Sequence, residues 1–178
     1  MNLKEKYQKE IAGKLKEDLK KKNVFEVPRI EKVVINIGVG KFLKDPAAIE
    51  EIQNSLAAIT GQKVVMVKAR TSIAGFKTRE GMEIGAKVTL RGKRMWDFLE
   101  KLVGVAVPRI RDFRGIKKSA IDQNGNLNLG IKEQVIFPEI SPEHVKNIFS
   151  FQVNVATSAK NQEEGDKLWR ALGFPIES

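Results

Sequence analysis

The sequence contains no cysteine and only one histidine, His144. Without cysteine there can be no disulfide, no thiolate metal site and no cysteine nucleophile. A single histidine cannot build a histidine metal site, and no Ser–His–Asp arrangement can be assembled around it. We therefore expect a protein that is not an enzyme and that carries no cofactor.

Long apolar runs are also missing. No run approaches the roughly 20 residues that a membrane span needs, and the first residues, MNLKEKYQKE, have no apolar core of a secretory signal. We therefore expect a cytoplasmic protein that works away from membranes. A chain of 178 residues is long enough for one domain, 1–178, with a core of its own.

Acidic residues are scarce in one third of the chain. The segment 60–120 carries 15 Lys and Arg against 5 Asp and Glu, which accounts for the whole net charge of +10, and the remaining residues balance. A charge excess confined to one segment indicates a directed electrostatic feature, and its commonest target is a polyanion.

Hydrophobic periodicity predicts an alternation of helices and strands. We expect helices over 3–22, 46–59, 93–103 and 161–172, and strands over 30–37, 62–68, 84–91, 126–131 and 149–155. The strands have one apolar and one polar face, which is typical of a mainly antiparallel sheet with helices on one side. The predicted fold class is therefore α+β, in two layers.

The polar faces of these strands share an unusual composition. They carry amides, hydroxyls and bases but no acids: Lys32, Asn36, Gln62 or Lys63, Lys87, Thr89, Arg91, Asn126, Asn128, Gln152 and Asn154. Such groups donate to phosphate and sugar oxygens or read base edges. The alternative is an ordinary solvated face, but the adjacent basic segment favours RNA or DNA.

The residues 69–83 form a long connection between two strands. Such a loop in a compact domain is usually functional or disordered. It is either a mobile insertion that is basic by accident or a long basic hairpin loop that grips phosphates through Arg70, Lys77 and Arg79.

Two short motifs are weak evidence for a phosphate site and a calcium site. The turn GVGK (38–41) resembles a phosphate loop, but Leu43 stands where the third glycine is needed, so a strand-ending turn is favoured. The residues 122–133 match several positions of a calcium loop, but Leu127 occupies the obligatory glycine position and strands flank it. A free-standing general nucleic-acid-binding protein and a phosphate-handling enzyme remain as alternative functions.

Six segments share the motifs of one known family: VPRIEKVVINIGVG (27–40), ITGQK (59–63), KAR-SIAGFK-REGM-IG-KVTLRG (68–92), PRIRDFRGI (108–116), NLGIKEQVIFPEI (128–140) and TSAKNQEEG (157–165). They span most of the chain in the order expected for that family. Through them the chain resembles bacterial large-subunit ribosomal protein number five, which binds 5S rRNA in the central protuberance.

The resemblance implies a structural ribosomal protein and no enzymatic activity. It assigns 5S rRNA binding to the sheet face, through Lys32, Asn36, Gln62, Lys63, Lys87, Thr89 and Arg91. It assigns contact with the P-site tRNA to the loop, through Arg70, Ser72, Lys77 and Arg79. It further implies contacts with 23S rRNA and, across the subunit interface, with a small-subunit protein.

Overall fold

The structure, a computed structural model, describes residues 2–76 and 78–177. Its centre is a five-stranded sheet of β1 (Ile30–Gly38), β2 (Val65–Lys68), β3 (Glu83–Leu90), β4 (Leu127–Ile131) and β5 (Phe151–Thr157). The spatial order is β2-β3-β1-β5-β4, and every neighbouring pair is antiparallel. The predicted α+β class with an antiparallel sheet is confirmed.

The strands alternate between a buried and an uncovered face, as the sequence pattern predicts. On the central strand β1, Val33, Ile35 and Ile37 are at most 2% exposed, whereas Asn36 is exposed. Side chains of successive strand residues point to opposite faces, so the apolar set lies on one side of the sheet. Val88 on β3 continues the same core.

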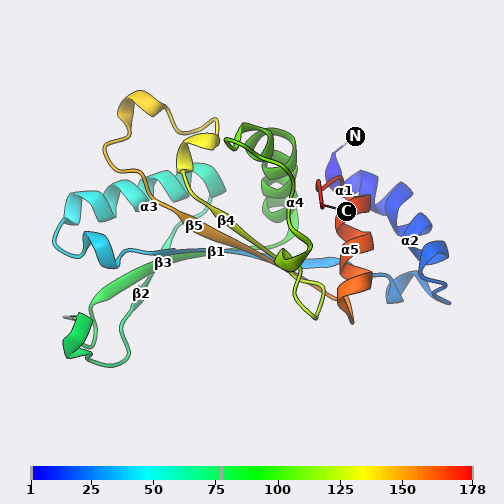
Figure 1. The fold of residues 1–178 in the computed structure, drawn as a ribbon, viewed down its shortest axis with the longest axis horizontal. Helices are drawn as coiled ribbons and strands as arrows, with labels where there is room; N and C mark the ends of the chain where they lie inside the picture. Colours follow the sequence, from blue (N-terminus) through cyan, green and yellow to red (C-terminus); the bar gives the residue numbers. More distant parts are fainter. Residues whose placement is uncertain (1, 77, 178) are drawn as a thin grey trace.

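The helices lie on the apolar side and at one end of the sheet (Figure 1). In Figure 1, α3 (Pro46–Thr60) and α4 (Gly92–Lys101) lie above the sheet, and α4 runs on as a π-helical turn to Ala106. The helices α1 (Leu3–Lys6), α2 (Ala12–Asp18) and α5 (Gln162–Ala171) gather at the end where β1 begins. This confirms the predicted two layers.

Helix ends follow local chemistry. The side chain of Asn161 accepts the amide hydrogen of Glu164 and so caps α5, as predicted. Gly61 ends α3 with φ +65°, a left-handed conformation that glycine adopts without cost. Asp45 caps the start of α3 by accepting from the amides of Ala47 and Ala48.

Several predicted boundaries are wrong by two to four residues. The first helical run ends at Asp18 rather than at 22, because Lys20 takes φ +50° and turns the chain so that Lys21 reaches Glu164 on α5. The strand β2 begins at Val65 rather than at 62. The strand β5 runs over Phe151–Thr157 rather than 149–155.

The connection between β2 and β3 extends away from the helices at the far end of the sheet (Figure 1). Its base is closed by backbone bonds from Ala69 N to Met82 O (2.8 Å) and from Gly81 N to Ala69 O (3.0 Å). Further out, Ile73 and Thr78 exchange two backbone bonds. The hairpin 69–82 is therefore braced at two levels along its length.

Within the described residues, none of the helices combines the length and the apolar character required to cross a bilayer.

Candidate nucleic-acid interface

The side of the sheet that the helices leave uncovered is here called the outer face. It is formed by side chains that alternate with the buried ones: Lys32, Val34, Asn36, Val65, Lys87, Thr89, Asn128, Gln152 and Asn154.

Strand pairing arranges these side chains in rows across the sheet. In one row Lys87 on β3 lies opposite Asn36 on β1, and Asn36 lies opposite Gln152 on β5. Neighbouring strands are about 4.8 Å apart, so each polar group lies beside the next. Asn36, Lys87 and Gln152 are all exposed. The row therefore offers two amides and an ammonium group to a partner.

A second row runs parallel to the first. Thr89 lies opposite Val34, which lies opposite Asn154, which lies opposite Asn128. Asn154 donates an Nδ2 hydrogen to Asn128 Oδ1. That bond fixes the orientation of both amides and leaves their remaining donors and acceptors in a defined direction.

Four of the seven predicted 5S rRNA-binding residues therefore lie together on the outer face: Lys32, Asn36, Lys87 and Thr89. The others lie at its margin. Gln62 and Lys63 precede β2, and Arg91 follows β3 at the N-cap position of α4. Lys63 and Arg91 are exposed, whereas Gln62 is half-buried.

Gln62 has a structural contact that sequence reasoning missed. Its Nε2 donates to the backbone carbonyl of Thr89 at 2.9 Å, and Arg94 Nη1 approaches its Oε1 at 3.5 Å. The amide thus connects the chain before β2 to the end of β3. A long-range bond of this kind has no signal in local sequence, because its partner is a backbone atom.

The structure corrects the prediction that Asn126 lies on the outward face of the sheet. It precedes β4, where its Oδ1 accepts from Thr157 N and its Nδ2 donates to Asp122. Asp122 Oδ1 also accepts the amides of Asn124 and Asn126 at 2.9 Å. These side chains hold the turn before β4 together, which is the reason for the calcium-like spacing of polar residues.

Positive charge gathers beside the outer face, where β3 ends and α4 begins. Among the described residues, the two rows contain no acidic side chain. Lys93 and Arg94 are exposed in the first turn of α4, directly after Arg91. Among the described bases of 60–120, Lys101 is the one with an ion pair, to Glu139, and it also donates to Ile59 O. The other bases of this segment that the structure describes can meet an anion.

The loop residues lie at the far end of the sheet from the α2–α5 end (Figure 1). Arg70 and Arg79 are exposed on the two sides of the hairpin 69–82. Ser72, also exposed, accepts the amide hydrogen of Glu80 through Oγ at 2.9 Å and so braces the hairpin. Lys77, the fourth predicted tRNA-contacting residue, lies outside the described residues.

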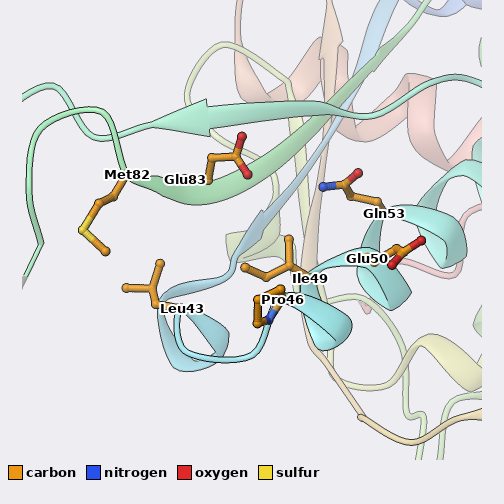
Figure 2. A pocket seen from close by; sticks show the side chains of 7 residues that line it. All are labelled: Leu43, Pro46, Ile49, Glu50, Gln53, Met82 and Glu83. Carbon is orange, nitrogen blue, oxygen red and sulfur yellow. The ribbon is translucent and has the colours of Figure 1, made fainter.

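A groove lies between the base of the hairpin and the start of α3 (Figure 2). Its lining comprises Leu43, Pro46, Ile49, Glu50, Gln53, Met82 and Glu83, without a basic residue among those described. The groove adjoins the GVGK turn (38–41), which runs into a 3₁₀ turn, Gly40–Phe42, after β1. Two carboxylates repel phosphate, so the geometry disfavours a nucleotide site here.

Comparison with known proteins shows similarity along nearly the whole chain. Residues 23–79 match the family described as Ribosomal protein L5, and residues 83–176 match the C-terminus of the same ribosomal protein family. The second match supplies β3, β4 and β5, which share the sheet with the β1 supplied by the first. Both matched segments therefore contribute to one sheet.

Individual relatives are similar over nearly the same length. The chain is 49% identical over 174 residues to the large ribosomal subunit protein uL5 of Marinomonas sp. strain MWYL1, covering 98% of this chain and 97% of the relative. It is 50% identical over 172 residues to that of Syntrophomonas wolfei, covering 97% of each. For Chloroflexus aurantiacus the identity is 49% over 176 residues, covering 99% and 98%.

These names are those of ribosomal proteins, a structural rather than an enzymatic family, as the motifs led us to expect. They confirm the predicted location in the cytoplasm, in the ribosome. Identity of this level over this length leaves a single conclusion: the chain belongs to the ribosomal protein L5 family and is a structural constituent of the large ribosomal subunit.

Proposed function

We propose that this protein binds 5S rRNA through the outer face and contacts the P-site tRNA through the hairpin 69–82. The observation that carries the first part is the pairing of β3, β1 and β5. It sets Lys87, Asn36 and Gln152 side by side on an uncovered surface whose described rows contain no acidic side chain.

The chemistry of the outer face suits folded RNA. An RNA helix presents a wide, shallow minor groove with 2′-hydroxyls, and a flat sheet can lie against it. Asn36 and Thr89 can exchange hydrogen bonds with hydroxyls and base edges, while Lys32 and Lys87 neutralise phosphates. The amides supply specificity, and the lysines supply affinity that falls with salt.

The hairpin suits a separate partner. Because it extends from the far end of the sheet, its Arg70 and Arg79 can meet a second RNA while the outer face is occupied. The exposed basic residues of the segment 109–118 offer further contacts for 23S rRNA. We place the small-subunit protein among the partners on the resemblance alone.

The test is a titration of the purified protein against 5S rRNA and an RNA of equal length, at two salt concentrations. The variant is Asn36→Ala/Thr89→Ala. Its matched control is Asn54→Ala/Ser55→Ala on α3, away from the outer face, where Asn54 is exposed and Ser55 half-buried. Losing one or two hydrogen bonds should weaken 5S binding by about 5- to 150-fold, and the control should bind like the wild type.

The alternative outcome is equally clear. If both RNAs bind equally, with a steep salt slope and no effect of the double variant, the outer face is a generic basic surface. The assignment of 5S recognition to it would then be wrong.

A further inference from the structure

One aromatic side chain is left in solvent. Phe25 is 88% exposed, more than any other large apolar side chain in the described part of the chain. Its neighbour Val24 is 50% exposed. Scattered exposed apolar residues are normal, but an almost fully exposed phenylalanine on a folded segment has a hydration cost that a partner can relieve.

The segment that carries Phe25 is held firmly. Val24–Glu26 form a 3₁₀ turn, and the side chain of Asn23 caps it by accepting from Phe25 N at 3.1 Å. The next residue, Val27, is buried in the core, and the carbonyl of Pro28 accepts from Tyr7 Oη at 2.9 Å. Phe25 is therefore presented on a fixed backbone, which lowers the entropy lost on binding.

Positive charge accompanies the ring. Lys20, Lys22 and Arg29 lie within five residues of Phe25, with Glu26 as the adjacent acid, and all three bases are exposed. Lys21 is not available, because its Nζ pairs with Glu164 at 2.6 Å. Lys20 and Lys22 stand five and three residues before Phe25, on the exposed chain that leads into the 3₁₀ turn.

We propose that Phe25 stacks on an unpaired base of ribosomal RNA while Lys20 and Lys22 contact the flanking phosphates. An aromatic face beside cations is the arrangement that binds unstacked bases. The site lies where β1 begins, at the opposite end of the sheet from the hairpin 69–82 (Figure 1). The inference rests on the proposed function only in requiring that the protein binds ribosomal RNA.

Three substitutions of Phe25 distinguish stacking on an RNA base from binding to another kind of partner. Phe25→Ala removes the ring, Phe25→Leu keeps an apolar side chain without a ring, and Phe25→Tyr keeps the ring. Affinity is measured for 5S rRNA and for large subunits depleted of this protein, and thermal unfolding confirms that each variant folds. Stacking is worth about 5- to 150-fold in affinity per base.

We expect Phe25→Ala and Phe25→Leu to lose affinity by that factor, and Phe25→Tyr to retain it. A loss with 5S rRNA places the base there, whereas a loss with depleted subunits alone places it in 23S rRNA. Either result supports the proposal. Wild-type binding by Phe25→Leu would indicate a protein pocket and would overturn it, as would unchanged binding by Phe25→Ala in both assays.

The two proposals can be refuted independently of each other. The variant Asn36→Ala/Thr89→Ala is titrated in the same assays. If it binds 5S rRNA like the wild type, the outer face is refuted while the Phe25 result still stands.

Discussion

The side-chain amide of Gln62 donates to the backbone carbonyl oxygen of Thr89 across 2.9 Å. Both residues were predicted to bind RNA, yet their contact is internal to the protein. Gln62 thus fixes the position of the strand end that carries Thr89. A residue that both supports the sheet and borders the outer face should affect stability as well as binding.

We predict that Gln62→Ala lowers the free energy of unfolding by about 1 kcal/mol, because the Thr89 carbonyl loses a half-buried donor. Asn36→Ala removes an exposed side chain and should change stability by less than about 0.5 kcal/mol. Urea unfolding measures both. Equal stability of the two variants would show that the Gln62 bond contributes nothing to the fold.

The lysine of the first row should control the salt dependence of RNA binding. Each phosphate contact contributes about 0.7 to 0.9 to the slope of log K against log salt. We therefore predict that Lys87→Ala reduces that slope by about this amount for 5S rRNA. Lys14→Ala, at an exposed position on α2, is the control and should leave the slope unchanged.

The two proposed RNA contacts should be separable by mutation. We predict that Arg70→Ala/Arg79→Ala weakens P-site tRNA binding to ribosomes by roughly 2- to 10-fold, because exposed ionic contacts are individually modest. The same variant should bind 5S rRNA like the wild type, because the hairpin extends beyond the outer face. A larger loss of 5S affinity than of tRNA affinity would place the hairpin on 5S rRNA instead.

Gly165 on α5 packs closely against Gly125 in the turn before β4. A Cβ on Gly165 would lie 2.4 Å from the Gly125 Cα, and Gly125 itself has φ +78°. Trp169 Nε1 also donates to the Gly125 carbonyl. We predict that Gly165→Ala destabilises the protein by about 1–3 kcal/mol or more, because backbone must move to admit the methyl group.

The matched control for Gly165 is Gly13 on α2, where an added Cβ meets nothing within 4 Å. Alanine is the better helix former there, so Gly13→Ala should stabilise the protein by about 0.5–1 kcal/mol. Thermal unfolding of both variants checks the pair. Stabilisation by both substitutions would contradict the close approach of Gly125 and Gly165.

Glu164 makes stability depend on pH in the acid range. Burial raises the pKa of Glu164, but the bond from Lys21, the Lys160 amide and the charges of both lysines outweigh it, so the pKa lies below its usual value of 4.5. A carboxylate with a lowered pKa stabilises the fold above its unfolded pKa. That stabilisation is lost as the pH falls through the folded pKa.

We therefore predict that Glu164→Gln is less stable than the wild type by about 1–3 kcal/mol at pH 7. The difference should shrink as the pH falls from the ordinary carboxyl range through the lower pKa of Glu164 in the folded protein, where the wild-type carboxyl becomes protonated too. Urea unfolding at pH 7 and pH 3 measures this. A difference that stays constant with pH would mean that charge has no part in the Lys21–Glu164 contact.

The sequence by itself determined the elements and their faces. The alternation around Val33, Ile35 and Ile37 marks the buried side of β1, because side chains in a strand point alternately to opposite faces. Asn161 predicts the start of α5 because a cap acts within three residues. The motifs likewise predicted the family. The predicted boundaries at 22 and 62 are wrong because long-range contacts decide where those two elements stop and start.

The tertiary structure alone decided which polar side chains are neighbours on the outer face. Asn36, Lys87 and Gln152 are far apart in the sequence, and no local pattern predicts the strand order that makes them neighbours. The structure also places Asn126 in the turn before β4 and shows that Gln62 bonds to a backbone carbonyl within the protein. Strand order follows from burying all the apolar faces together, which is a property of the whole chain and of no single segment.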